Sequence, residues 1–351
     1  MSSRLNRLRG LLGELEVDAL LVTNGTNVRY LCGFESSNAQ LLVDADRAVL
    51  LTDGRYLEAA ARTPDVDVVE TTHEPPADLG GRLAELARGR VGFEAATVTV
   101  AAHAKLARSG VELVPTERAV ERLRAIKDAS ELDAIRAAAH AGDLLYGRLA
   151  VEPVVGRSEA ELAWWIELAL RDLGAEDVSF PPIVASGPNA ARPHHHPGDR
   201  LVEAGETFLV DSGCIVGGYC SDCTRTFATG SLPAEIERAY AVCLEAQLAT
   251  LEAVRPGAAC EEVDAVARRM VGDAGYTVYH NVGHSLGLEI HEDPRLAKGS
   301  TETLQAGHVV TVEPGVYLPG LGGIRIEDLV IVTDDGAEIL TPFSKELRAT
   351  A

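Results

Sequence analysis

The sequence predicts an α+β protein of two domains, a smaller α/β domain over residues 1–123 and a larger one over residues 124–351. Three observations support this prediction. Short apolar runs alternate with helical patterns up to about residue 116, and a charged stretch over residues 117–130 then interrupts them. From residue 207 to residue 332, pairs of apolar strands are joined by glycine-rich turns. With 351 residues, 46% of them hydrophobic, the chain can bury a core in each domain.

The first domain shows helix and strand patterns in alternation. Leucines recur at helical spacing from Leu5 to Leu15, and an apolar run over residues 19–22 predicts a buried strand. The remaining expected elements are strands over 41–43, 48–51 and 111–114, the last ending before Pro115, and helices over 79–86 and 101–107. Such alternation favours a mixed or parallel sheet.

The second domain shows clear helix boundaries. Ser130 and Asp133 fit a helix start, and Ser158 with Glu161 predicts a capping box at the next one. Two further helices are expected near residues 234–254 and 261–274.

Charge and cysteine content narrow the functional classes. A net charge of −21 disfavours nucleic acid and anionic membranes as partners. We expect the 6 cysteines to be free thiols, and Cys220-x-x-Cys223 lacks the second pair that a zinc site of this kind needs. No apolar stretch suits a signal peptide or a membrane span, which favours a cytoplasmic protein.

Two hairpins each carry two carboxylates. Asp211 ends an apolar strand and Asp222 leads into the next, almost symmetrically about the turn at Gly217-Gly218. Glu313 and Glu327 flank a second glycine-rich turn in the same way. Like charges that face each other on a sheet are destabilising, and a bound cation would compensate for them. The alternative is that these acids lie on a solvated face or pair with arginines.

A histidine adds a nitrogen ligand to this set. His284 lies in a glycine-flanked loop, Gly283-His-Ser-Leu-Gly-Leu-Glu-Ile-His291. Four carboxylates and one imidazole suit two divalent cations, with Mn²⁺ or Co²⁺ preferred and Zn²⁺ as an alternative. The predicted metal ligands are Asp211, Asp222, His284, Glu313 and Glu327.

These motifs resemble the pita-bread metallopeptidases, and most of all their proline-specific branch, aminopeptidase P and prolidase. The similar segments include Val-Asp211-Ser-Gly, Ser-Asp222-Cys-Thr-Arg-Thr-Phe, Val-Glu313-Pro-Gly and Ile-Arg-Ile-Glu327-Asp. The resemblance implies a curved antiparallel sheet covered by helices in the catalytic domain, preceded by a creatinase-like N-terminal domain. It also implies a homodimer.

The resemblance further assigns roles to single residues. It implies that Asp211 binds one metal, that His284 and Glu313 bind the other, and that Asp222 and Glu327 bridge them. The remaining assignments are His194 and His291 as substrate-side groups, Glu313 as acid and base, Arg325 beside Glu327, and Thr224 and Tyr219 next to the acids. His195 and His196 leave the choice of His194 open by one residue.

The implied activity is hydrolysis of an N-terminal Xaa-Pro bond by metal-activated water, in a short proline-containing peptide. The pocket rim decides whether longer peptides fit, and the sequence does not show it. We therefore place an Xaa-Pro aminopeptidase only slightly ahead of an Xaa-Pro dipeptidase. A creatinase-like non-peptidase would lack the metal ligands. A methionine aminopeptidase would generally lack the N-terminal domain.

Overall fold

The computed structural model describes residues 3–72 and 75–348, which divide into two compact units, Met1–Arg124 and Ala125–Ala351. Each unit is described by itself. Within the described ranges, no helix combines the length and the apolar character needed to cross a membrane.

The first unit is built on a mixed sheet with strand order β4-β3-β2-β1-β5-β6. Its strands are β1 (Ala19–Val22), β2 (Ala39–Asp44), β3 (Ala48–Asp53), β4 (Asp67–Thr71), β5 (Arg90–Glu94) and β6 (Glu112–Thr116). Its helices are α1 (Ser3–Leu11), α2 (Gly25–Cys32), α3 (Leu57–Ala60), α4 (Pro75–Leu86), α5 (Val100–Leu106), the 3-10 turn η1 (Ala107–Ser109) and α6 (Glu121–Ala125). The predicted mixed sheet is confirmed.

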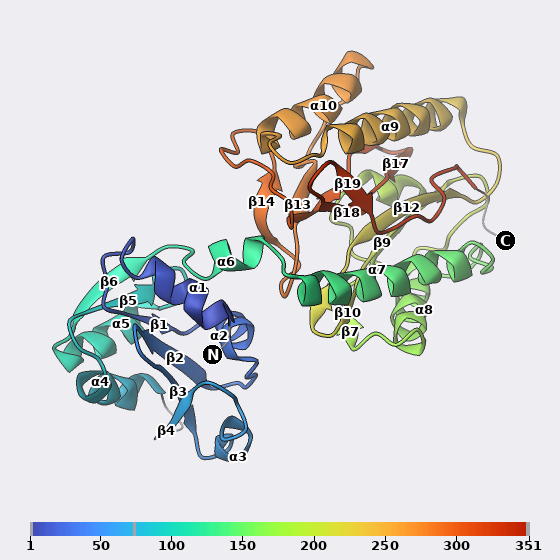
Figure 1. The fold of residues 1–351 in the computed structure, drawn as a ribbon. Helices are drawn as coiled ribbons and strands as arrows, with labels where there is room; N and C mark the ends of the chain where they lie inside the picture. The colour runs from blue at the N-terminus through green and yellow to red at the C-terminus, as the bar shows by residue number, and fades with distance from the viewer. Residues whose placement is uncertain (1–2, 73–74, 349–351) are drawn as a thin grey trace. The chain divides into compact units, whose positions relative to one another are not determined.

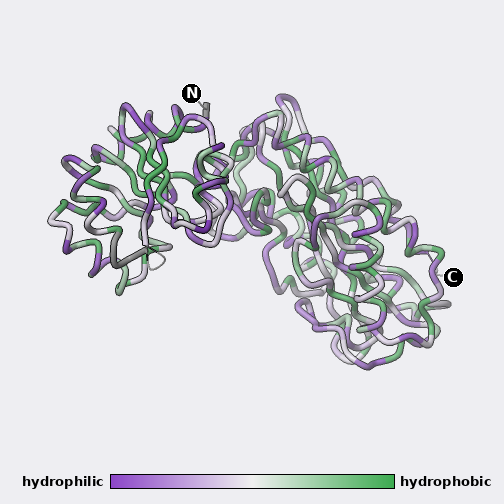
Figure 2. The backbone as a smooth tube through the Cα atoms, turned by 90° about the horizontal axis from the view of Figure 1, so that it is seen from below, coloured by the Kyte–Doolittle hydropathy of each residue, from purple (hydrophilic) through white to green (hydrophobic). Residues whose placement is uncertain are grey.

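The core of this unit lies on its apolar strands. The strands β1, β2 and β3 are buried along almost their whole length, and Figure 2 shows hydrophobic residues (green) along the middle of this unit. Strand β6 continues through Pro115, where the sequence predicted its end. This is tolerated because β6 lies at the edge of the sheet, where a missing N–H breaks no ladder.

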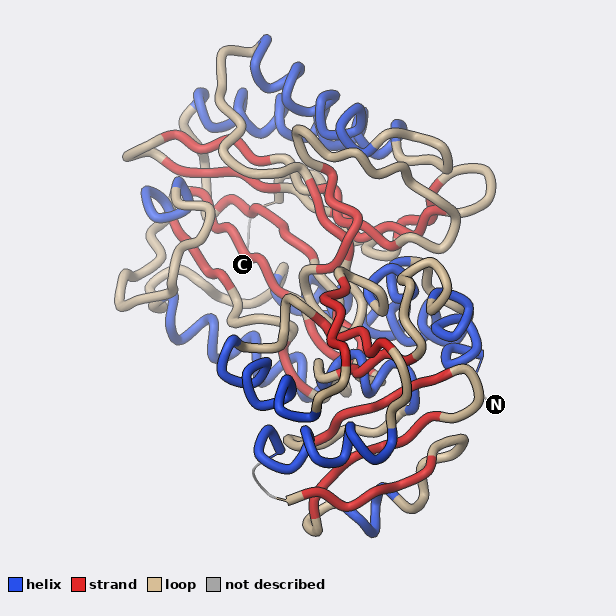
Figure 3. The backbone as a smooth tube through the Cα atoms, turned by 90° about the vertical axis from the view of Figure 1, so that its left-hand side faces the viewer, coloured by secondary structure: helices blue, strands red, loops and turns tan. Residues whose placement is uncertain are grey.

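The second unit places antiparallel strands between two pairs of helices. The helices are α7 (Ala129–Leu149), α8 (Glu159–Asp172), α9 (Ala234–Ala253) and α10 (Cys260–Asp273). Figures 1 and 3 show α7 and α8 on one side of the strands and α9 and α10 on the other. This arrangement confirms the predicted fold class, with antiparallel sheets covered by helices.

The strands of this unit form several small sheets. They are β7 (Asp177–Val178), β8 (Ile183–Ser186), β9 (Thr207–Ser212), β10 (Cys214–Val216), β11 (Tyr219–Cys220), β12 (Cys223–Ala228), β13 (Gly283–Ser285), β14 (Glu292–Leu296), β15 (Val309–Val312), β16 (Gly315–Leu318), β17 (Gly322–Arg325), β18 (Asp328–Val332) and β19 (Ala337–Ile339). The sheet orders are β11-β10-β7, β12-β9-β8, β14-β13-β15-β18-β19 and β16-β17. The turn η2 (Gly187–Ala191) follows β8.

The starts of α7 and α8 show how local chemistry sets a helix boundary. Ser158 and Glu161 form the predicted capping box of α8. Helix α7 begins two residues earlier than predicted, because Asp128 rather than Ser130 caps it and pairs reciprocally with Glu131.

Candidate metal centre

The first hairpin brings Asp211 and Asp222 onto one face. Strands β9 and β12 pair with Asp211 opposite Thr224, and Asp222 stands two residues before Thr224. The two acids are therefore diagonal neighbours, displaced by two residues from the opposite placement that the turn symmetry suggested. The chain turns at Gly217 and Gly218, whose φ angles are 60° and 78°.

The second hairpin places its acids opposite each other. Val312 pairs with Asp328 between β15 and β18, and Gly315 pairs with Arg325 between β16 and β17. The same register brings Glu313 opposite Glu327. This part of the sequence prediction agrees with the structure.

The two hairpins meet at the acids. The Thr224 hydroxyl donates to Glu327 Oε2 at 2.7 Å, and the Glu327 N–H donates to the Thr224 carbonyl at 3.1 Å. Asp211, Asp222 and Glu327 are buried, and one ligand atom from each lies within 4.8 Å of the others. Carboxylates that lie more than 100 residues apart in the sequence, Asp222 and Glu327, thus belong to one cluster.

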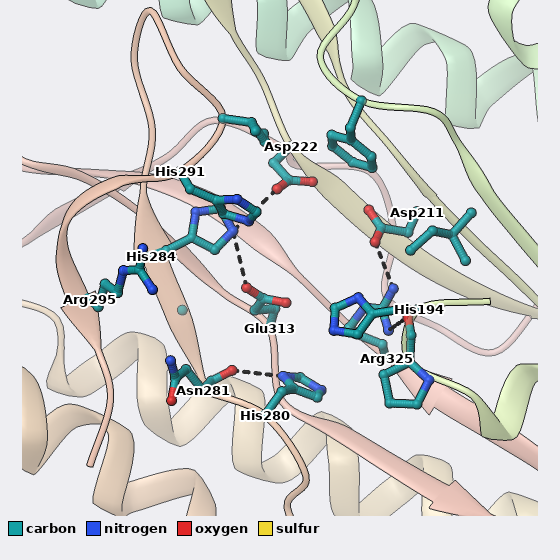
Figure 4. Close-up of a pocket in the computed structure, with 15 residues that line it drawn as sticks. His194, Asp211, Asp222, His280, Asn281, His284, His291, Arg295, Glu313 and Arg325 are labelled. Atoms are coloured by element: carbon teal, nitrogen blue, oxygen red, sulfur yellow. Dashed lines mark hydrogen bonds and ion pairs between the residues drawn. The ribbon is translucent and has the colours of Figure 1, made fainter. Parts of the chain in front are cut away.

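His284 joins the cluster from β13. Its Nε2 lies 3.6 Å from Asp222 Oδ2 and 3.4 Å from Glu313 Oε1, as Figure 4 shows. Its Nδ1 lies 3.1 Å from the Ser285 carbonyl oxygen, which can only accept a hydrogen bond. This contact places the proton on Nδ1 and leaves the lone pair of Nε2 facing the acids, the state that a metal ligand requires.

The electrostatics of the cluster favour a cation. Burial, together with the neighbouring carboxylates, raises the pKa values of Asp222 and Glu327 well above their usual range. Burial also raises the pKa of Glu313 and lowers that of His284. The charged acids are therefore unfavourable together unless positive charge lies between them.

Unpartnered oxygens show where such a charge fits. Among the described residues, the buried atoms Asp211 Oδ1, Asp222 Oδ1 and Glu327 Oε1 have no hydrogen-bond partner. Buried polar atoms are normally satisfied, so these three oxygens match the donor set of divalent cations.

Arg325 holds a different acid from the one expected. Its Nη2 lies 2.6 Å from Asp211 Oδ2, and its Nε donates to the Thr224 hydroxyl at 3.1 Å. Among the described residues, the hydrogen-bonded link between Arg325 and Glu327 runs through Thr224. Tyr219 was expected next to the acids; its hydroxyl donates to Glu131 at the start of α7.

A cavity of about 450 Å³ opens onto the acids. Its apolar wall consists of Phe180, Ile183, Pro193 and Ile290. The other lining residues include the predicted residues His194 and His291, and also His280, Asn281 and Arg295. The His291 ring lies 4.5 Å from that of His284.

The side chains of the three consecutive histidines lie in different surroundings. His194 lines the cavity, whereas the His195 Nε2 lies 2.7 Å from the buried Glu159 and His196 is not among the residues that line the cavity. Of the three, His194 is therefore the one that can contact a bound molecule.

Sequence reasoning missed three charged or polar groups of the cavity, His280, Asn281 and Arg295. His280 Nε2 lies 2.8 Å from the Tyr317 hydroxyl, which accepts from Arg325 at 2.9 Å. The one sequence signal for His280 was its position four residues before His284. Arg295 lies opposite His284 in the pairing of β13 with β14, a register that the sequence does not reveal.

Each of the two units matches a known protein family. A model described as metallopeptidase family M24 matches residues 133–334, and a model described as the creatinase/prolidase N-terminal domain matches residues 4–126. The chain is 32% identical to the Xaa-Pro dipeptidase of Pyrococcus furiosus over 353 residues, covering 99% of this chain and 100% of that protein.

Solved structures show the same likeness. The Xaa-Pro dipeptidase from Bacillus anthracis is 36% identical with a TM-score of 0.95, and 99% of each chain is covered. The X-Pro aminopeptidase from Thermotoga maritima MSB8 is 30% identical with a TM-score of 0.90, again over 99% of each chain.

Proposed function

The chain belongs to metallopeptidase family M24, and we propose that within this family it is an Xaa-Pro dipeptidase, cleaving the bond before proline in a dipeptide with a free amino terminus. It is a hydrolase that acts on peptide bonds. The relatives from Pyrococcus furiosus and Bacillus anthracis support a dipeptidase better than the aminopeptidase that the sequence analysis placed first.

The observation that supports a dipeptidase is a positively charged side chain, that of Arg295, in the pocket. Arg295 lines the cavity opposite His284, and its nearest acidic partner, Asp293, is 3.7 Å away. A dipeptide presents its carboxylate one residue beyond the scissile bond, where a guanidinium can bind it. A longer peptide has a neutral amide at that place.

Members of this family use a dinuclear divalent metal centre, and the buried acids of this chain fit one. We propose Asp211 as a ligand of one cation and His284 with Glu313 as ligands of the other. Asp222 and Glu327 would be shared, since Asp222 lies near both Asp211 and His284. The expected cations are Mn²⁺ or Co²⁺, with Zn²⁺ as an alternative.

Two cations held there would lower the pKa of a shared water toward neutrality and polarise the peptide carbonyl. In this proposal, Glu313 takes a proton from the attacking water and returns it to the proline nitrogen. His194 and His291 donate hydrogen bonds to the carbonyl oxygen as it gains negative charge. Arg325 holds Asp211 in orientation.

Peptides of different length test this proposal. With Mn²⁺ added, we expect two metal ions per chain and cleavage of Ala-Pro, with kcat/KM for Ala-Pro-Ala at least roughly 100-fold lower, since the tripeptide loses the charge-assisted contact. Arg295→Met should raise KM for Ala-Pro and leave metal content unchanged. The exposed Arg269 serves as the matched control, in an Arg269→Met variant.

Comparable cleavage of both peptides would make the enzyme an aminopeptidase, and cleavage of neither with no bound metal would overturn the peptidase assignment. The homodimer expected from the family stays a prediction, which light scattering tests.

A further inference from the structure

A fully buried carboxylate lies beside the pocket without belonging to it. Glu159 is the first residue of α8 and has 0% of its surface exposed. The helix start does not need it, because Ser158 and Glu161 already form the capping box there. Its side chain turns instead toward the segment that follows β8.

That segment surrounds the carboxylate with donors. Glu159 Oε1 accepts from both the backbone N–H and the hydroxyl of Ser186, each at 2.8 Å. The Asn189 amide donates to both carboxylate oxygens at 3.1 Å. His195 Nε2 completes the set at 2.7 Å from Oε2.

The position of His194 depends on its two neighbours in sequence. The Pro193 carbonyl accepts from Arg325 Nη1 at 3.4 Å, and His195 is held by Glu159. Within the described residues, no hydrogen bond to the His194 ring is found. The position of His194 is therefore set by the backbone of its neighbours, Pro193 and His195. Figure 4 shows the His194 ring in the same pocket as Arg325 and Asp211.

From this geometry we propose that Glu159 and His195 are positioning residues, which act together to hold His194 in the substrate pocket. The inference rests on the role given to His194 in the proposed function. A buried carboxylate costs free energy unless donors satisfy it, and here the donors come from the segment that leads to His194. Loss of the carboxylate would leave those donors unsatisfied and release His195.

A double-mutant cycle tests this coupling. Glu159→Gln keeps the shape of the side chain but places an amide among donors. In the otherwise unchanged holoenzyme we expect kcat for Ala-Pro to fall roughly 10- to 100-fold, with KM changed less than about threefold and metal content unchanged. In a His194→Ala background the same substitution should lower kcat by less than about threefold, because the positioned group is gone.

Matched variants separate positioning from general stability. Glu167→Gln, on the same helix, should leave activity unchanged. His195→Gln keeps a donor near the Nε2 position and should retain most activity, whereas His195→Ala should match the loss in Glu159→Gln. These two variants carry the test if Glu159→Gln does not fold.

The outcomes distinguish the positioning role of Glu159 and His195 from the role of His194 itself. Equal fold-losses from Glu159→Gln with and without His194, or equal losses in His195→Gln and His195→Ala, would overturn the positioning role alone. Full activity of His194→Ala would overturn the role of His194 in the proposed function, and the positioning role with it.

Discussion

Each buried acid of the cluster has one oxygen with a polar neighbour and one without. Asp211 Oδ2 contacts Arg325, and Glu327 Oε2 contacts Thr224, whereas Oδ1 and Oε1 of the same residues have no partner among the described residues. Asp222 follows the same rule, with Oδ2 nearest His284. The partnered oxygens fix the orientation of the carboxylates and leave the others directed at a shared volume.

The first residue-scale prediction concerns Asp222. Asp222→Asn should lower bound metal, and activity should fall by at least roughly 100-fold, because a charged ligand becomes a neutral one. The metal-free variant should be at least as stable as the metal-free parent, since burial raises the pKa of Asp222 and disfavours its charged form. Metal analysis and urea unfolding with chelator measure both effects.

The exposed Asp273 at the end of α10 provides the control for this variant. Asp273→Asn should bind metal as the parent does. Full metal content and full activity in Asp222→Asn would contradict the role proposed for Asp222.

The second residue-scale prediction concerns pH and His308. Burial, with a smaller effect from Lys127, lowers the pKa of His308 from 6.5 to about 4, and its Nδ1 accepts from the Gln305 N–H at 3.1 Å. Because folding lowers this pKa, the unfolded chain takes up the proton first. The contribution to stability is full above about pH 6.5 and declines as the pH falls toward 4.

His308→Asn keeps an acceptor for Gln305 and cannot be protonated. Between pH 7 and pH 5, the free energy of unfolding of the metal-free parent should fall more than that of the variant, by on the order of 2 kcal/mol. Tryptophan fluorescence suits the measurement, because Trp164 and Trp165 both lie in α8 of this unit. Parallel pH profiles for the two proteins would contradict the prediction.

At the scale of elements, one construction occurs twice in the second unit. The helices α7 and α8 precede the hairpin of β9 and β12, and α9 and α10 precede the hairpin of β15 and β18. Each hairpin supplies two acids, and the hairpins meet where Thr224 contacts Glu327. The acid cluster therefore depends on the hairpin geometry as much as on the acids themselves.

A substitution at Gly213 tests whether the acid cluster depends on the hairpin geometry. A Cβ at Gly213 would lie 1.8 Å from the Ser221 carbonyl oxygen, so Gly213→Ala must displace backbone between Asp211 and Asp222. We expect lower metal occupancy and a loss of stability of about 1–3 kcal/mol. Gly272→Ala in α10 meets nothing within 4 Å and should be neutral or slightly stabilising. Parent-like metal binding by Gly213→Ala would contradict this account.

At the scale of the molecule, the cations should contribute to the stability of the second unit. A ligand that binds only the folded state at one hundred times its Kd adds about 2.7 kcal/mol. Removing metal with a chelator should therefore abolish peptide hydrolysis and lower the urea midpoint reported by tryptophan fluorescence. Added Mn²⁺ should restore both. A chelator-treated protein with an unchanged midpoint would show that the acids do not bind cations in the folded state.

Local structural features could be predicted from the sequence wherever the interacting residues are close along the chain. The capping box of α8, the turn at Gly217-Gly218 and the apolar strand β1 were predicted on this basis and agree with the structure. The helix start at Asp128 was missed, because Asp128 and Ser130, two residues apart, offered competing caps.

The four acids could be proposed as candidate ligands from the sequence alone, since an acid at the end of an apolar strand is conspicuous and hairpin symmetry pairs it with another. The partner of Arg325, the choice among three histidines, and the presence of Arg295 in the pocket required the tertiary structure. Those features depend on register and on contacts between segments about 100 residues apart, such as Arg325 with Asp211 at a separation of 114. Periodicity along the chain carries no information about such distances, and the packing of the two hairpins decides them.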